Sequence, residues 1–192
     1  MLEDHGSCHM NHVLRIPRLV RILPLTVFAG LSLSGCGINT IPTLDENAKA
    51  KWSDVQNQYQ RRSDLIPNLV ETVKGYAAQE RQVLTEVTEA RAKVSQIKVD
   101  ASTITDPAKF KEYQDAQSAL TGALGRLLVT VERYPDLKSN QNFLALQSQL
   151  EGTENRIAIA RRDYNEAARV YNTELKTFPG HSYKPMETFT VG

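Results

Sequence analysis

The chain has 192 residues, 23 of them basic and 22 acidic, a length for which one domain is expected. The near-balanced charge gives no reason to expect a nucleic-acid partner, because binding to nucleic acid depends on a positive field. Aromatic residues make up only 7% of the chain and glycine and proline are few, which is typical of an all-α protein.

Residues 1–36 have the pattern of a secretory signal peptide. Arg15, Arg18 and Arg21 precede an apolar run over 22–33, which is shorter than the roughly 20 residues that cross a bilayer as a helix. The run ends in Leu-Ser-Gly-Cys, which resembles the bacterial lipobox. We therefore expect Cys36 to be lipidated, with palmitate among its acyl chains, and to become the first residue of the mature chain. A short anchor that is never cleaved is the alternative.

This leader also predicts where the protein resides. Its arginines should stay in the cytoplasm, which places the rest of the chain on the extracytoplasmic side of the membrane, in the periplasm. Gly37 follows the cysteine, and by resemblance to lipoprotein sorting it predicts the outer membrane if the host has two. Lipidation of Cys36 and loss of Cys8 would leave no free thiol. Residues 37–42 are then a short polar tether.

The helical domain is predicted over residues 43–179. Thr43 and Glu46 form a capping box, and an apolar stripe with helical spacing follows from 48 to 97. Pro67 interrupts this stripe, because proline lacks an N–H and its ring clashes with the preceding turn. We expect a helix kinked near Pro67, or two helices that share one stripe.

The segment around this proline, residues 61–68, is the best candidate for a partner site. Pro67 frees a backbone carbonyl near Ser63, and polar side chains of the same segment are expected to donate to it. Asp64 is expected to cap the part that begins at Leu65. A bend with nothing bound is the alternative. The candidate interaction residues of this segment are Arg61, Arg62, Asp64 and Asn68.

Arg62 and Glu80 are the two charged residues of the apolar stripe. We expect each to pair with a charge of the last helix, such as Glu151, Glu154 or Arg161, and so to fix the helix register. Arg161, which is followed by a second arginine, is also a candidate for binding lipid headgroups or an acidic partner. A solvated helix face is the alternative reading of that pair.

Two further helices follow. Asp106-Pro107 is a helix start, and that helix should end before Tyr134-Pro135. The last helix runs from about Phe143 to Phe178, where Pro179-Gly180 stops it. It carries Tyr-Asn at 164–165 and again at 171–172. These tyrosines are expected to pack with their hydroxyls at the edge of the helices, with a polar ladder for a partner helix as the alternative. Residues 180–192 form an irregular tail that is mobile or lies along the helices.

Short loops between long helices place neighbouring helices antiparallel. The sequence therefore predicts an antiparallel up-and-down bundle of three long helices, counted as four if Pro67 divides the first, with coiled-coil-like stripes.

Two blocks of the chain carry a further pattern. The first reads RRSDLIPNLVETVKGYA over 61–77 and continues as LTEVTEARA over 84–92, and the second covers 134–179. Both blocks resemble the LemA family. The resemblance implies an antiparallel helical bundle that is tethered to a bacterial membrane by its amino terminus. The activity of the family is not established, so no catalytic residue is carried over. Many members keep a transmembrane helix, whereas this chain has the lipobox around Cys36.

The sequence offers little to an enzyme. No Glu is followed three residues later by His, and His181 is the only histidine after the leader, so neither a metal nor another cofactor is expected. We expect a membrane-tethered, noncatalytic interaction or scaffolding module of the cell envelope, with an unidentified protein partner or a second copy of itself. One alternative is a bundle that binds lipid or a small ligand in an apolar cavity. The other is an enzyme with converging carboxylates.

Overall fold

The computed structural model of the protein describes residues 40–177 and 183–190. These residues contain five helices and no strand, so the predicted all-α class is confirmed. The predicted signal peptide, the lipidation site Cys36 and the helix stop at Pro179-Gly180 lie outside the described residues. The helices are α2 (Thr40–Tyr76), α3 (Arg81–Gln96), α4 (Pro107–Val131), α5 (Pro135–Lys138) and α6 (Gln141–Thr177).

Local sequence signals account for most helix boundaries. Asp106 is the N-cap of α4, as predicted, and its carboxylate accepts hydrogen bonds from the backbone amides of Ala108 (2.9 Å) and Lys109 (3.3 Å). The last helix ends at Thr177, within one residue of the prediction. The first helix begins at Thr40, three residues before the predicted capping box, with a proline in its first turn where a missing N–H costs nothing.

The long apolar stripe is divided after Tyr76 and not at Pro67. Helix α2 is continuous through Pro67, and residues 77–80 form the turn that leads to α3. Tyr76 has the helical spacing of the apolar stripe and was therefore expected to be buried, but it is 45% exposed, because the neighbouring Ala77 takes the buried position instead. The amide of Glu80 donates to the carbonyl of Ala77 (3.0 Å), which closes the turn.

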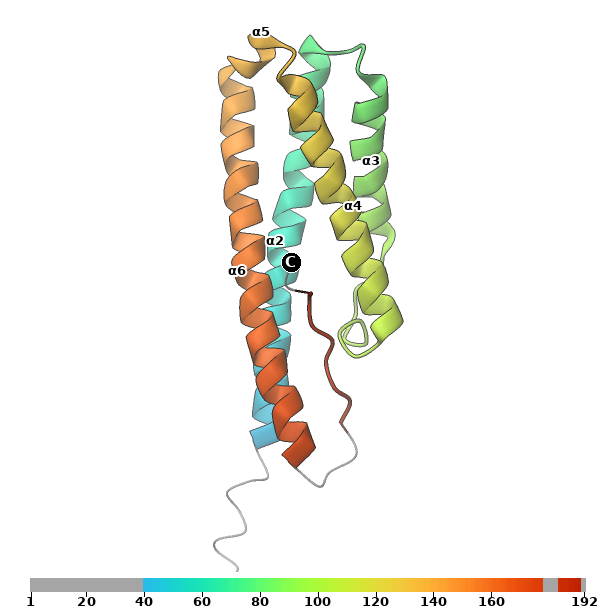
Figure 1. Ribbon diagram of the computed structural model, residues 1–192, viewed down its shortest axis with the longest axis vertical. Helices are drawn as coiled ribbons and strands as arrows, with labels where there is room; N and C mark the ends of the chain where they lie inside the picture. Colours follow the sequence, from blue (N-terminus) through green and yellow to red (C-terminus); the bar gives the residue numbers. More distant parts are fainter. Residues whose placement is uncertain (1–39, 178–182, 191–192) are drawn as a thin grey trace, which may run out of the picture. The chain divides into compact units, whose positions relative to one another are not determined.

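Figure 1 shows α2, α4 and α6 side by side, with α3 beside α4. The one-turn helix α5 lies between the end of α4 and the start of α6 and contacts both. The sequence pattern did not predict α5, because four residues are too few to show a helical period. The C-terminal segment, residues 183–190, is extended and runs between α4 and α6.

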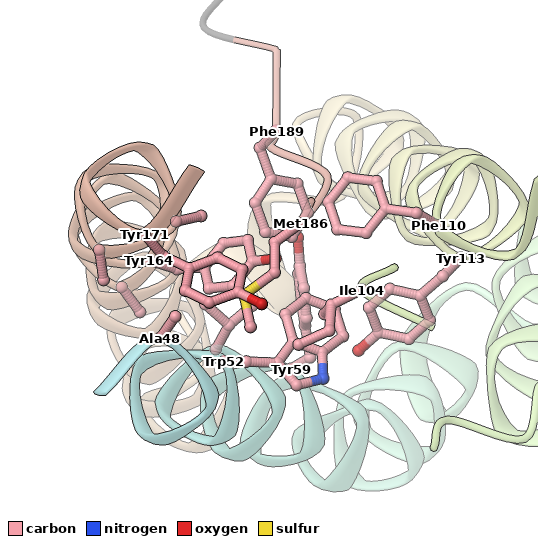
Figure 2. Close-up of a cluster of buried hydrophobic side chains, with 14 of the residues drawn as sticks. Ala48, Trp52, Tyr59, Ile104, Phe110, Tyr113, Tyr164, Tyr171, Met186 and Phe189 are labelled. Atoms are coloured by element: carbon pink, nitrogen blue, oxygen red, sulfur yellow. The ribbon is translucent and has the colours of Figure 1, made fainter. Parts of the chain in front are cut away.

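Two hydrophobic clusters form the core. The aliphatic cluster is made of side chains from all five helices, including Val73, Leu84, Leu127 and Leu137, and it contains one buried aromatic ring. The aromatic cluster is centred on Trp52 and takes side chains from α2, α4, α6 and the C-terminal segment. The ring of Trp52 lies within 6.0 Å, centroid to centroid, of four other aromatic rings: Phe110, Tyr113, Tyr164 and Phe189. Figure 2 shows this cluster from one end.

Candidate functional site

Arg62 lies on the buried face of α2, at the boundary between the two clusters. Its neighbours along that face are Tyr59 in the aromatic cluster and Ile66 in the aliphatic cluster. The Arg62 side chain is 1% exposed. A guanidinium at such a position loses its hydration and must find acceptors within the protein.

Three side chains from two other helices supply these acceptors. Nη1 of Arg62 donates to Oγ1 of Thr121 (2.7 Å) and to Oε1 of Glu154 (2.9 Å), while Nη2 donates to Oε1 of Gln117 (2.6 Å). The network joins α2 to α4 and α6. The predicted pairing of Arg62 with Glu154 is therefore confirmed, whereas Gln117 and Thr121 were not singled out because uncharged residues in a stripe give no such signal. Nε of Arg62 has no hydrogen-bond partner among the described residues.

The same guanidinium also contacts an aromatic ring. Cζ of Arg62 lies 5.1 Å from the ring centroid of Tyr59, a cation–π distance. Burial raises the pKa of Tyr59 above its usual value, and the positive charges of Arg161 and Arg62 partly offset that rise. Tyr59 is therefore a neutral packing residue at neutral pH.

The other candidates of the 61–68 segment do not gather around Arg62. Arg61, Asp64 and Asn68 are exposed on α2. The carboxylate of Asp64 accepts a hydrogen bond from Nε2 of Gln60 (2.7 Å) inside a continuous helix, so the predicted cap at Leu65 was wrong. The structure thus places one of the four candidates in the core and three on the surface.

The carbonyl freed by Pro67 has a donor on another helix. Nε of Arg91, on α3, donates to the backbone carbonyl of Ser63 (2.9 Å). The prediction that a side chain of the same segment would serve was wrong, because α3 packs against this part of α2 and brings the guanidinium to the exposed oxygen. This contact satisfies the acceptor that makes a mid-helix proline costly.

Glu80 also differs from its prediction. Its Oε1 accepts hydrogen bonds from Nη2 of Arg133 (3.0 Å) and from the hydroxyl of Tyr134 (2.7 Å), not from the last helix. The chain turns at 77–80, which places Glu80 beside the connection between α4 and α5. The hydrogen bond to Glu80 raises the pKa of Tyr134.

The C-terminal segment is held mainly through its backbone. Asn165 and Asn172 each bind it with both ends of the side-chain amide. Asn165 accepts from the amide of Phe189 (2.8 Å) and donates to its carbonyl (2.9 Å). Asn172 does the same with Met186, accepting at 2.8 Å and donating at 2.7 Å. A peptide bound in this way has the pairing that a neighbouring β-strand would provide.

The tyrosines of the Tyr-Asn repeat complete the ladder. The hydroxyl of Tyr164 donates to the carbonyl of Glu187 (2.7 Å), and that of Tyr171 donates to the carbonyl of Lys184 (3.2 Å). On the opposite side, the amide of Glu187 donates to the carbonyl of Ile104 (2.7 Å). The two tyrosines of the repeat are buried and use their hydroxyls at the edge of the helices, as predicted. The repeat also forms a polar ladder, which binds an extended segment of the same chain and not the partner helix of the alternative.

Two side chains anchor the C-terminal segment in the core. Met186 and Phe189, three residues apart, are 4% and 3% exposed and belong to the aromatic cluster, where Figure 2 shows them between the helices. Cζ of Arg161 lies 4.5 Å from the ring centroid of Phe189, and its Nη2 donates to the carbonyl of Thr190 (3.3 Å). Arg161 thus contacts the C-terminal segment and is not the partner of Glu80, whose carboxylate binds Arg133 and Tyr134. We call this site, where residues 183–190 lie between α4 and α6, the segment groove.

A pocket also lies between α4 and α6, lined by residues other than those of the segment groove. This open pocket of about 520 Å³ is lined by three leucines, Leu124 and Leu128 of α4 and Leu150 of α6, and by four polar side chains: Thr121, Glu151, Glu154 and Asn155. We call it the leucine pocket. Two of its polar lining residues, Thr121 and Glu154, are partners of Arg62, so the leucine pocket adjoins the polar network.

The described residues offer neither a cluster of metal ligands nor a membrane span. Over 40–177 and 183–190, no group of three or more His, Cys, Asp or Glu side chains is placed to hold a metal ion. None of the helices in these ranges combines the length and the apolar character needed to cross a bilayer.

Comparison with known proteins gives a family and several relatives. The profile described as "LemA family" matches residues 51–191. Magnetosome protein MamQ 2 of Paramagnetospirillum magneticum is 29% identical over 84% of this chain and 65% of its own length. Protein LemA of Metamycoplasma hominis is 30% identical over 65% of this chain and 52% of its own length. Magnetosome protein MamQ of Magnetospirillum gryphiswaldense is 27% identical over 73% and 58%, respectively. The chain thus spans between about half and about two-thirds of the length of these relatives.

Proposed function

The chain belongs to the LemA family, and on that premise we propose that it is a membrane-tethered, noncatalytic scaffolding protein of the bacterial envelope. Its helical domain would be an antiparallel up-and-down bundle on the extracytoplasmic side, attached through a lipid on Cys36. The helices that lie side by side in Figure 1 and share two hydrophobic clusters support the bundle arrangement.

The observation that carries the tether is the apolar run that ends in Leu-Ser-Gly-Cys at Cys36. A run of this length fits a cleaved signal peptide better than a permanent span. Attachment at Cys36 would leave only a few residues between the lipid and α2, which begins at Thr40. The domain would then sit close to the membrane surface.

The contacts that the buried and interhelical polar side chains make support a binding role. Arg62 joins α2 to α6 through Glu154, and Asn165 and Asn172 bind the backbone of the C-terminal segment. Such contacts position polypeptides and place no nucleophile beside a base. None of the names of the three relatives denotes a reaction.

The tether is tested by changing Cys36 to Ser in the native host and supplying a labelled fatty acid. The proposal predicts that wild type incorporates the label and that Cys36→Ser accumulates as an unlabelled precursor. Cys8→Ser, which changes the other cysteine, should label normally. Equal labelling of wild type and Cys36→Ser would contradict the tether.

The side of the membrane is tested by adding protease to spheroplasts. The helical domain should be cleaved there, together with a known periplasmic control protein. If it is cleaved only after lysis, the proposed location is wrong.

A second candidate function is binding of a lipid or a small apolar ligand, and the leucine pocket favours it. Its test uses two adjacent residues of α4. Leu128 is half-buried and lines the pocket, whereas Val129 is 72% exposed. Leu128→Arg should abolish binding of a fluorescent fatty acid and Val129→Arg should not. If wild type shows no saturable binding of the fatty acid, this candidate is excluded.

A further inference from the structure

The segment groove has the features of a peptide-binding site. Five side chains of α6 form hydrogen bonds with the C-terminal segment, and all of these bonds are to its backbone atoms: Arg161, Tyr164, Asn165, Tyr171 and Asn172. Backbone recognition of this kind supplies affinity for any extended chain and leaves specificity to the side chains that enter pockets. Here these are Met186 and Phe189.

We propose that the segment groove also accepts residues 183–190 of a second copy of this chain, so that copies are joined by exchange of their C-terminal segments. This inference rests on the proposed tether in one respect, because tethering concentrates the copies. Its chemistry rests on the contacts of the segment groove alone.

A second copy fits the groove without any new complementarity. It carries the same methionine and phenylalanine at the same spacing and can make the same hydrogen bonds in the same register. Exchange of an identical element between protomers is a route to association that needs no new interface. It only requires release of the segment, which has no secondary structure of its own to lose.

Whether the groove binds the segment of its own chain or the segment of a neighbouring copy depends on the concentration of copies. A segment attached by a short linker is present at its own groove at an effective concentration of roughly millimolar. In dilute solution the groove therefore keeps the segment of its own chain. On a membrane that gathers many tethered copies, the segments of neighbours compete on more equal terms.

Two complementary variants of the full chain make exchange between copies observable, because neither can fill its own groove well with its own segment. They are studied in mild detergent. The groove variant, Asn165→Ala with Asn172→Ala, keeps an intact segment but holds it poorly. The segment variant, Met186→Ala with Phe189→Ala, keeps an intact groove but lacks the anchors to fill it. We expect each variant alone to be monomeric and an equimolar mixture to form a one-to-one complex, measured by analytical ultracentrifugation.

A matched control replaces two exposed asparagines of the same helix, Asn142 and Asn155. The variant Asn142→Ala with Asn155→Ala keeps its own segment bound and should form no complex with the segment variant. The peptide Tyr-Lys-Pro-Met-Glu-Thr-Phe-Thr, residues 183–190, should dissociate the complex. A peptide with Met exchanged with Glu, and Phe with the preceding Thr, should not, because its apolar side chains would point away from the core.

A mixture that stays monomeric overturns the proposal, and so does dimerisation of the segment variant alone, since that association would use another surface. Circular dichroism establishes that both variants are folded. If either loses helix content, the single changes Asn172→Ala and Phe189→Ala replace the pairs, with the same expected outcomes. Normal fatty-acid labelling of Cys36→Ser would overturn the tether and leave this result in detergent unaffected.

Discussion

The aliphatic cluster is enclosed by the helices and the turn after α2, whereas the aromatic cluster is completed by an extended segment from the end of the chain. In the first cluster, apolar side chains at helical spacing meet across neighbouring helices. In the second, Met186 and Phe189 fill the core, and two asparagine side chains pair with the backbone amides and carbonyls of these same two residues. The comparison predicts that the aliphatic cluster opens only with the whole fold, whereas the C-terminal segment can leave the aromatic cluster by itself.

The largest effect is expected in the aliphatic cluster, to which residues 183–190 contribute no buried side chain. Leu127 is fully buried in the aliphatic cluster, so Leu127→Ala should lower the free energy of unfolding by about 2–5 kcal/mol. Val129→Ala, two residues away and mostly exposed, should change it by less than about 0.5 kcal/mol. Urea unfolding followed by circular dichroism measures both. Similar values for the two variants would contradict the burial of Leu127.

Substitutions in the C-terminal segment should lower the free energy of unfolding by less, and a second substitution there should add little to the first. Truncation of a phenylalanine in a closed core lowers the free energy of unfolding by about 3–5 kcal/mol. Phe189→Ala should lower it by less, because the segment can leave the groove, and its release sets an upper limit to the stability that can be lost there. For the same reason, adding Met186→Ala should cost little more. Urea unfolding of the two single variants and the double variant checks this. Full additivity would show that the segment does not open separately.

The asparagine ladder should contribute less than the buried anchors. Asn172→Ala leaves the amide and the carbonyl of Met186 unpaired, which should cost about 1–3 kcal/mol or release the segment. Asn142→Ala, at an exposed position of the same helix, should be within about 0.5 kcal/mol of wild type. Unfolding measured side by side compares them, and equal values would mean that the ladder adds no stability.

The tyrosine hydroxyls of the aromatic cluster are expected to affect the free energy of unfolding least at neutral pH and more as the solution becomes alkaline. Burial raises the pKa of four of them: Tyr59, Tyr113, Tyr164 and Tyr171. The unfolded chain then loses these protons first, so stability should be unaffected below about pH 10 and should fall as the pH rises beyond it. Tyr113→Phe should reduce this fall in urea unfolding across that range. An identical pH dependence in the variant would show that the buried Tyr113 hydroxyl is not among its causes.

The helices and one buried contact could be predicted because their signals are local or periodic. Asp106 is followed by the proline of a helix start, so the cap followed from the sequence. Arg62 interrupts an apolar stripe, which predicted a partner among the charges of the last helix but not which of the three named residues, and the structure shows Glu154. The division at Ala77 could not be located, because Tyr76 is also apolar and continues the same spacing. The contact of Arg91 with the carbonyl of Ser63 depends on how two helices pack, which no local pattern encodes.

The segment groove was predicted only in part. The Tyr-Asn repeat at 164–165 and 171–172 indicated a polar ladder, but a repeat of seven residues gives the face of a helix and not the identity of what lies on it. Residues 183–190 have no period, because an extended segment that is bound by side-chain amides needs only Met186 and Phe189 to be apolar.

Hydrogen exchange at the amides of Met186 and Phe189 tests most directly whether the C-terminal segment closes the aromatic cluster. Each amide donates to an asparagine side chain, so both should be protected in the native protein. In the variant Asn165→Ala with Asn172→Ala they should exchange quickly, while the amide of Leu127 in α4 keeps its protection. Rapid exchange of Met186 and Phe189 in wild type, or protection that survives the loss of both asparagines, would contradict the account.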